Sequence, residues 1–435
     1  MKKFLAVLCA VLMPSIFLSA CGGGTKVQND HVLPILIITT NGGRVPVDKV
    51  NFIDARIRLY NTENDKKFGF NKSAQIKLRG NSTMNLPKSP YRIKFTQNQS
   101  VFGSPANRNW ALLADYHDPS LIKNYTALKM AQEFDNMPWN AKGRHVNVYF
   151  NGSYRGVYLI ADHIDEKVGR LNLETPKDFL AGQPEYPFLV ETSYNLFYDD
   201  TVDPNDMLYF NIGIDGQQNT NVRIKYPEFE QGRTTGGGAY ISSQMQKFLS
   251  AISNNDFSAL FEICDINSYI DFMLLSEIMS SASTTSYYSK KVGEKIKFGP
   301  VWDFDNAMAR LFGAVEKSVE WLDAYELNYF LVPTARAFFE TMGADVYRVV
   351  QARFNELLPR VKQIIADVEA YYNVLVTDGT KNSWLWYADV QNQLKRSIFK
   401  RDYDIVLLFL KNHTAYLETL FKKNYNNFLS ATYNS

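Results

Sequence analysis

The residues best suited to chemistry in this chain are two aspartates, one residue apart, at the end of an apolar run. Asp303 and Asp305 stand beside Trp302 in the stretch IKFGPVWDFDNAMA. Carboxylates in such apolar surroundings must be solvated, paired with a base or bound to a cation. An enclosed pair of carboxylates suits a hard cation such as Mg²⁺. The alternative is structural, with Asp303 forming a turn after a strand and Asp305 capping a following helix.

Two basic residues at other predicted strands could act together with this pair. Arg79 begins the stretch RGNST, and Lys94 lies within PYRIKF. Side chains alternate along a strand, so Arg92 and Lys94 share one face while the apolar residues of this stretch share the other. A lone lysine on a strand is usually solvated. By itself, Lys94 therefore favours a solvated strand face over a binding role.

Several other catalytic centres are excluded because their sequence patterns are absent. The five histidines are scattered, and no His-x-x-x-His or Cys-x-x-Cys pair provides the spacing for zinc. The chain has neither a G-x-S-x-G nucleophile elbow nor a G-x-x-x-x-G-K-S/T phosphate loop. The histidines are therefore expected to be ordinary core or surface residues, and charged residues at strand ends remain as the candidates.

The composition predicts a globular protein without nucleic acid as a partner. The chain has 435 residues, of which 46% are hydrophobic and 14% aromatic, which is enough for a sizeable core in one or two domains. Its 47 basic residues nearly balance 45 acidic ones. A near-neutral chain offers no electrostatic basis for binding nucleic acid.

The first residues predict export and attachment to a membrane. Two lysines, an apolar run and small residues form a signal peptide over residues 1–20. The sequence Leu-Ser-Ala-Cys that ends at Cys21 resembles a bacterial lipobox, whose cysteine carries lipid, and residues 21–32 are predicted to be a flexible tether. We therefore expect a lipoprotein of the cell envelope, periplasmic or on the outer surface, that meets the membrane only through the lipid on Cys21. Cys264 would then have no disulfide partner and is expected to be a buried hydrophobe.

The elements that would position these residues divide the mature chain into two regions. Residues 33–235 are dominated by short alternating or β-branched runs such as ILIITT, YRIKF and GVYLIAD, with a hairpin predicted at Asn151-Gly152. One helix is predicted among them, capped by Asp118. Residues 236–430 are mostly helical, with a break near Pro359 and an embedded strand pair that carries the two aspartates. This order predicts an α+β fold with two lobes.

Six segments, taken in order, resemble the CotH spore-coat kinase family. The stretch LRGNSTMNLPKSPYRIKF looks like the family signature RGNSS…PKKPYRIKF. Each motif alone is weak, whereas six in one order are specific, and the resemblance extends from about residue 34 to about residue 425. The other five segments are NWALLADYHDPSLIKNYTALKMAQEF, VYFNGSYRGVYLIADHID, PFLVETS, YIDFMLLSEI and FGPVWDFDNAM.

The resemblance implies an atypical protein-kinase-like fold that binds ATP and Mg²⁺ between two lobes and can transfer phosphate to Ser or Thr of protein partners. Such transfer depends on charge neutralisation and positioning more than on covalent chemistry. Carried over to this chain, Asp303 takes the role of catalytic metal ligand. Asp305 would be a second ligand or would orient Asp303.

The resemblance also implies a set of nucleotide-binding residues in the strand-rich region. Lys94, together with Arg79, would face the phosphates. Asp162 of YLIADHI stands where the family usually has Glu, and it would be the carboxylate partner of Lys94. Glu191 of LVETS matches a family glutamate on the adenine side.

One departure from the family pattern leaves the activity open. Where the family commonly has Asn-x-Asp, whose aspartate is the candidate base, this chain has Ser281 and Ser283, and no carboxylate lies between Glu277 and Glu294. A serine cannot accept a substrate proton near neutral pH as a carboxylate does. Two functions therefore remain. One is an exported, ATP- and Mg²⁺-dependent Ser/Thr kinase, and the other is a pseudokinase that binds protein or glycan partners at the cell surface.

Overall fold

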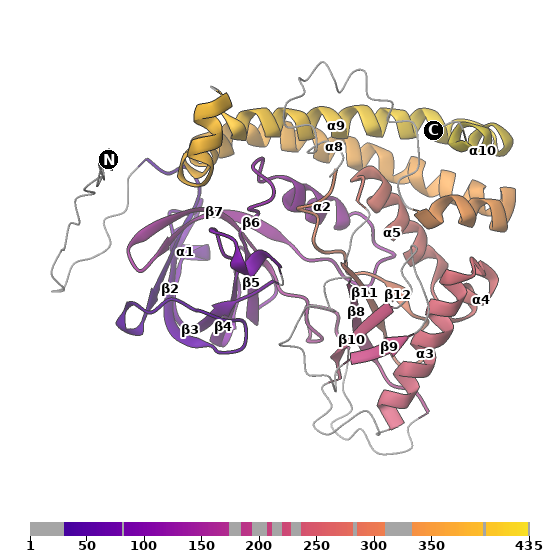
Figure 1. Ribbon diagram of the computed structural model, residues 1–435, viewed down its shortest axis with the longest axis horizontal. Coiled ribbons are helices and arrows are strands. Elements are labelled where there is room, and N and C mark those ends of the chain that lie inside the picture. Colours follow the sequence, from indigo (N-terminus) through magenta and orange to yellow (C-terminus); the bar gives the residue numbers. More distant parts are fainter. Residues whose placement is uncertain are drawn as a thin grey trace, which may run out of the picture.

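The computed structural model describes most of the chain as an α+β fold, strand-rich in its first half and helical in its C-terminal part, as predicted (Figure 1). The predicted signal peptide, Cys21 and Ser283 lie outside the described residues. The described residues are 30–80, 82–173, 184–193, 207–210, 220–227, 236–281, 285–308, 333–394 and 397–433.

The first half of the chain closes into a seven-stranded barrel (Figure 1). Its strands are β1 (Ile35–Thr40), β2 (Ile53–Tyr60), β3 (Phe70–Leu78), β4 (Tyr91–Gln99), β5 (Asn107–Leu113), β6 (Gly143–Phe150) and β7 (Ser153–Asp162). They follow the order β1-β2-β3-β4-β5-β7-β6, and the parallel pairing of β1 with β6 closes the ring. Alternation along the strands buries Ile57, Ile76 and Ile93 in the barrel core and leaves the polar side chains outside.

The turn between β6 and β7 is the hairpin predicted at Asn151-Gly152. The φ angles of these two residues are 47° and 85°. Asn and Gly are the residues that most readily adopt such left-handed conformations, which a tight hairpin requires. This prediction is confirmed.

A second sheet of five strands combines both halves of the chain (Figure 1). Its strands are β8 (Phe188–Ser193), β9 (Met207–Phe210), β10 (Thr220–Tyr226), β11 (Thr285–Lys290) and β12 (Lys297–Phe298), in the order β12-β11-β8-β10-β9. The pairing of β11 with β12 is the predicted strand pair that precedes the aspartates. Because β11 also pairs with β8, the segment that carries Asp303 and Asp305 is attached to strands from the first half of the chain.

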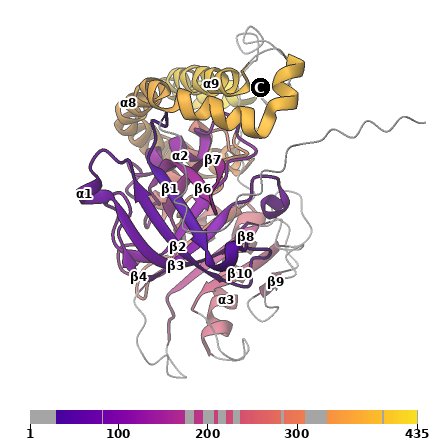
Figure 2. The same cartoon turned by 90° about the vertical axis from the view of Figure 1, so that its left-hand side faces the viewer.

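Two long helices, α8 (Pro333–Leu394) and α9 (Ile398–Phe421), run side by side over the barrel and the smaller helices (Figures 1 and 2). Phe354, Phe399 and Phe421 from this pair belong to the largest hydrophobic core. None of the helices in the described ranges is both long enough and apolar enough to cross a membrane. The other described helices are α1 (Asp65–Phe68), α2 (Lys123–Ala131), α3 (Gly236–Ser253), α4 (Phe257–Ile263), α5 (Ile266–Ile278) and α10 (Tyr425–Tyr433), with short 3-10 turns at Asn41–Gly43 and Ser82–Asn85.

Two details of the predicted helices are wrong. The helix expected after Asp118 begins only at Lys123, because Leu121 adopts a left-handed φ of 64°. Asp118 still stabilises this start, since its Oδ2 accepts a hydrogen bond from Lys123 N at 2.9 Å. The break predicted near Pro359 does not occur, and α8 continues through this residue. Because Pro359 has no N–H, the carbonyl of Asn355 lacks its helical hydrogen bond. Both residues are exposed, so water can bind that carbonyl instead.

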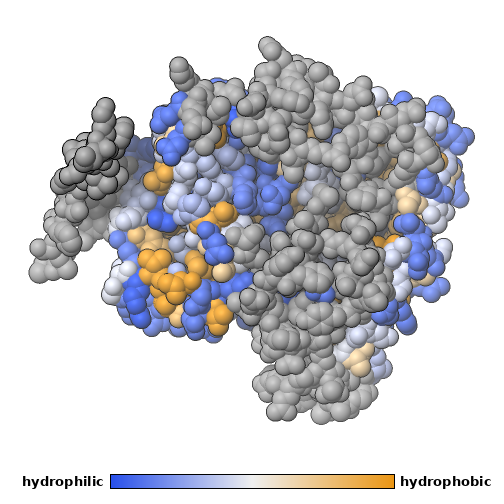
Figure 3. Space-filling view, viewed as in Figure 1, coloured by the Kyte–Doolittle hydropathy of each residue, from blue (hydrophilic) through white to orange (hydrophobic). Residues whose placement is uncertain are grey.

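The face of the molecule drawn in Figure 3 does not by itself mark a functional site among the described residues. The face seen in Figure 3 is largely hydrophilic where the structure describes it, with an apolar area over the barrel. Exposed apolar side chains include Val45, Val47 and Val50 in the connection between β1 and β2. Exposed apolar residues of this kind are normal on the surface of a folded protein. The candidate site is therefore sought in a pocket.

Candidate functional site

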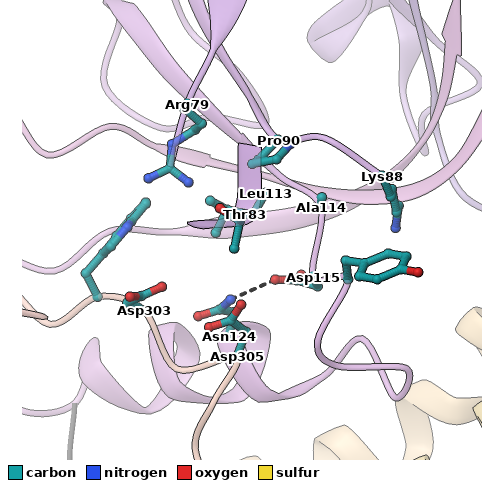
Figure 4. Close-up of a pocket in the computed structure, with 12 residues that line it drawn as sticks. Arg79, Thr83, Lys88, Pro90, Leu113, Ala114, Asp115, Asn124, Asp303 and Asp305 are labelled. Atoms are coloured by element: carbon teal, nitrogen blue, oxygen red, sulfur yellow. Dashed lines mark hydrogen bonds between the residues drawn. The ribbon is translucent and has the colours of Figure 1, made fainter. Parts of the chain in front are cut away.

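A pocket lies where the ends of β3 and β5 face the segment that follows β12 (Figure 4). The barrel supplies one wall and the aspartate segment supplies the other, so residues from both halves of the chain meet across it. The lining residues are Arg79, Thr83, Lys88, Pro90, Leu113, Ala114, Asp115, Tyr116, Asn124, Trp302, Asp303 and Asp305.

Both aspartates that the sequence singled out line this pocket. Asp303 is half-buried and has a left-handed φ of 71°, a conformation that costs energy for a residue with a Cβ. Asp305 is buried, and within the described structure its Oδ1 has no hydrogen-bond partner. Burial, followed by the neighbouring carboxylates of Asp115 and Asp118, raises the pKa of Asp305 to about 6, and Lys123 acts in the opposite direction. An open, buried carboxylate oxygen of this kind fits a bound cation.

Helix α2 holds the aspartate segment in position. The buried amine of Lys123 donates hydrogen bonds to the carbonyl oxygens of Asp305 at 3.1 Å and Ala307 at 2.7 Å. The next residue, Asn124, accepts a hydrogen bond from Phe304 N at 2.8 Å through its Oδ1. These bonds fix the backbone on both sides of Asp305, so its carboxylate has a defined position before any ligand binds.

Asp115 is a third acid of the pocket, which the sequence interpretation missed. It follows β5, and its Oδ1 accepts a hydrogen bond from Asn124 Nδ2 at 2.7 Å. Burial raises the pKa of Asp115 to about 7, and the adjacent charge of Lys88 acts in the opposite direction. A signal was present, because Asp115 directly follows the buried run WALLA, much as Asp303 follows a strand.

The lysine at the pocket is Lys88, which the sequence interpretation also missed. It is completely buried, its amine donates a hydrogen bond to the carbonyl of Val157, and it lies 4.6 Å from the ring centre of Tyr158. Burial lowers the pKa of Lys88 to about 7, although Asp115 and Asp118 favour its charged form. A buried amine beside carboxylates can complement anionic groups that enter the pocket.

The structure brings only one of the predicted nucleotide-binding residues to the two aspartates. Arg79 lines the pocket, with its guanidinium 5.4 Å from the ring centre of Trp302. Lys94 lies on the outer face of the barrel, with its amine 5.5 Å from the ring centre of Phe52, and is not among the lining residues. The predicted position of Lys94 opposite the apolar residues of its strand is confirmed, because closure of the barrel turns that face outward.

The two remaining predicted acids have other partners. Asp162 forms an ion pair with Arg170 at 2.9 Å, rather than with Lys94, and both side chains are buried. Glu191 forms an ion pair with Lys225 at 3.2 Å in the second sheet. Neither Asp162 nor Glu191 lines the pocket.

The acids of the pocket could hold a cation only together with other oxygen atoms. Within the described part of the chain, no three His, Cys, Asp or Glu side chains are arranged to bind a metal ion. Mg²⁺ is commonly bound by one or two carboxylates, with phosphate oxygens and water completing six ligands. Asp303 and Asp305 fit that mode, since Asp305 offers a buried oxygen without a partner.

The raised pKa of Asp305 predicts a dependence of stability on pH. A carboxyl whose pKa is raised on folding stabilises the fold at low pH, and this contribution is lost as pH rises from about 4 to about 6. Relative to Asp305→Asn, the wild type should therefore lose on the order of 2 to 3 kcal/mol over this range in urea unfolding. Added Mg²⁺ should restore part of that loss above pH 6, because it favours the ionised carboxylate. Parallel pH profiles for the two proteins would contradict the assignment.

The segment in which the base is missing lies against the aspartate segment. Ser281 is buried and donates its backbone N–H to the carbonyl of Ser276 at 2.9 Å. The carbonyl of Ser280 accepts a hydrogen bond from Met308 N at 3.0 Å. The loop after α5 therefore contacts the end of the aspartate segment. Ser283 lies outside the described residues.

Comparison with known proteins gives one family. The family model described as "CotH kinase protein" matches residues 76–417, which is most of the chain and includes every residue that lines the pocket. Among curated proteins, none matches the chain.

Proposed function

The chain belongs to the CotH kinase family, and we propose that it binds ATP with Mg²⁺ at the pocket and transfers phosphate to Ser or Thr of a protein partner. The observation that carries this proposal is the opposition of charges across one pocket. Asp303 and Asp305 lie on one wall, and Arg79 and Lys88 lie on the other (Figure 4). Phosphoryl transfer needs carboxylates that bind a metal ion, opposite basic side chains that bind phosphate. It needs little covalent chemistry from the protein.

Each group has a role in this proposal. Asp303 and Asp305 would hold Mg²⁺, which when bound neutralises phosphate charge. Lys123, through the Asp305 carbonyl, keeps the carboxylate in place. Arg79 and Lys88 would bind the phosphate oxygens, and Arg79 is suited to this because its guanidinium offers two parallel donors.

A group of cations on the outer face of the barrel and on the second sheet supports an anionic ligand. Lys77 of β3 lies directly opposite Arg92 of β4, and like charges that face each other across two strands repel. Burial, followed by the charges of Arg92, Arg223 and Lys94, lowers the pKa of Lys77 to about 8, and Asp48 acts in the opposite direction. Since Arg223 belongs to β10, the cations come from both the barrel and the second sheet. An extended anion such as a triphosphate would relieve their repulsion, and Lys94 would contribute to binding it from the edge of this group.

Titration with Mg-ATP tests the proposal. The wild-type chain should bind Mg-ATP, and Asp303→Ala should weaken binding by roughly 100-fold, equivalent to about 2.7 kcal/mol, because it removes a metal ligand. Isothermal calorimetry in the presence and absence of Mg²⁺ measures this effect. Asp54→Ala is the matched control, since Asp54 is exposed on the barrel and should leave binding unchanged. No binding by the wild type at millimolar Mg-ATP would overturn the proposal.

A second candidate function is a nucleotide-binding or partner-binding protein without transfer activity. It is favoured by Ser281 and Ser283, which stand where the family commonly has Asn-x-Asp. The proposed lipid anchor at Cys21 supports it further, since an exported protein meets little free ATP. This candidate predicts that the wild type fails to transfer labelled phosphate even if it binds Mg-ATP.

A further inference from the structure

Asp115 is a buried acid of the pocket with no part in the proposed nucleotide contacts. In Figure 4 it lies between Lys88 on one side and the pair Asp303 and Asp305 on the other. Its Oδ1 accepts the hydrogen bond from Asn124 Nδ2 at 2.7 Å, while its buried Oδ2 has no hydrogen-bond partner in the described structure. A buried acceptor without a hydrogen bond destabilises the fold unless a ligand in the pocket donates one.

The backbone around Asp115 is held firmly. Asp115 has a left-handed φ of 47°, which is uncommon for a residue other than glycine. Its carbonyl accepts a hydrogen bond from Asp118 N at 3.1 Å, and the carbonyl of Tyr116 accepts one from the hydroxyl of Tyr387 in α8 at 2.5 Å. Unfavourable conformations persist only where the surroundings impose them, and they concentrate at functional sites. The carboxylate is thus positioned in advance.

The kind of ligand that fits Asp115 Oδ2 follows from charge and geometry. A phosphate oxygen would be repelled by the carboxylate. A metal ion shared with Asp303 and Asp305 is disfavoured, because no three such side chains in the described ranges are arranged around one ion. A neutral hydrogen-bond donor remains, and a hydroxyl group or a water molecule is the smallest that can enter.

We propose that Asp115 is the proton acceptor for phosphoryl transfer, replacing the acid that is absent at residues 281–283. This inference rests on the proposed function. In the step, the oxygen of a Ser or Thr hydroxyl forms a bond to the γ-phosphorus of ATP. The bond between that phosphorus and the oxygen bridging to the β-phosphate breaks, and its electron pair leaves with ADP. The hydroxyl proton passes to Asp115 Oδ2.

Two substitutions in the full chain test the inference. Asp115→Asn keeps an oxygen for Asn124 but cannot take a proton. Asp115→Glu keeps the charge that offsets Lys88 but moves the carboxylate by about one methylene length. We expect Asp115→Asn to lower kcat by about 10²–10⁴-fold and Asp115→Glu by at least about tenfold, each with Mg-ATP affinity within about threefold of wild type. The measurements are calorimetry with Mg-ATP and transfer of labelled phosphate from ATP to a mixed Ser/Thr peptide library and to water.

The control is Asp378→Asn, which changes another buried carboxylate that is outside the pocket lining. It should leave kcat unchanged. Wild-type turnover by Asp115→Asn, or full activity of Asp115→Glu, would overturn the inference, as would loss of Mg-ATP binding in a folded Asp115→Asn. A wild type that transfers phosphate while Asp115→Asn keeps the same kcat overturns the inference alone. A wild type that does not bind Mg-ATP, or that binds it without any turnover, overturns the proposed function as well.

Discussion

Replacing Asp271 by alanine is expected to lower the free energy of unfolding by about 3–5 kcal/mol. Asp271 is completely buried in α5 and accepts hydrogen bonds from Nε and Nη2 of Arg353 in α8, both at 2.8 Å, and from Asn136 N at 3.1 Å. The hydrogen bonds with Asp271 are the largest cause of the raised pKa of Arg353. Alanine would leave a largely buried guanidinium without its main partner. Urea unfolding of the purified protein measures the loss.

A matched control is available on the same arginine. Asp135 also binds Arg353 Nη2, at 2.6 Å, but the side chain of Asp135 is 80% exposed. Water and salt screen an exposed pair, so Asp135→Ala should cost less than about 1 kcal/mol. Equal losses for Asp271→Ala and Asp135→Ala would show that burial does not set the strength of this cluster.

The fold was predictable from the sequence where its signals are local. The hairpin at Asn151-Gly152 and the strand pair that precedes the aspartates depend on short-range backbone preferences, and both occur as expected. Closure of the barrel depends instead on the parallel pairing of Ile35–Ile38 with Asn147–Phe150. These segments lie far apart in the chain, and no local pattern encodes their pairing. The pairing of β8 with β11 in the second sheet could not be predicted for the same reason.

The candidate site shows the same division. Arg79 could be chosen because it directly follows a predicted strand, and Asp303 and Asp305 because they are charged residues at the end of an apolar run. Lys88 offered no such signal, and Asp115 could have been chosen from the apolar run WALLA that precedes it. Their meeting depends on how the connection after β3 and the end of β5 fold against α2, which is a tertiary arrangement. A lysine in a loop is usually solvated, so nothing in the sequence separates Lys88 from the exposed majority.

Replacing Lys123 by methionine is expected both to destabilise the fold and to weaken Mg-ATP binding. Methionine fills a similar volume but donates no hydrogen bonds, so the carbonyls of Asp305 and Ala307 lose their partner, at about 1–3 kcal/mol each. Lys123 is also a buried positive charge near Asp115, Asp118, Asp305 and Asp402, all of which favour its charged form. We expect a loss of about 3–5 kcal/mol in urea unfolding and Mg-ATP binding weakened by at least about tenfold, equivalent to about 1.4 kcal/mol.

The matched control is Lys129→Met, which makes the same substitution at a partly exposed lysine of the same helix. Lys129 lies on the same helix, but its partner is Asp367, and the two side chains are 35% and 41% exposed. Lys129→Met should therefore change stability by less than about 1 kcal/mol and should leave Mg-ATP binding unchanged.

If Lys123→Met lowered the free energy of unfolding without affecting Mg-ATP binding, α2 would be a structural support alone. If Lys123→Met lowered the affinity for Mg-ATP as well, the hydrogen bonds from α2 to the Asp305 and Ala307 carbonyls would be what positions the aspartate segment for the metal. Partial recovery of the stability of Lys123→Met by Mg²⁺ would support the second outcome, because a cation can replace the missing positive charge among the four acids.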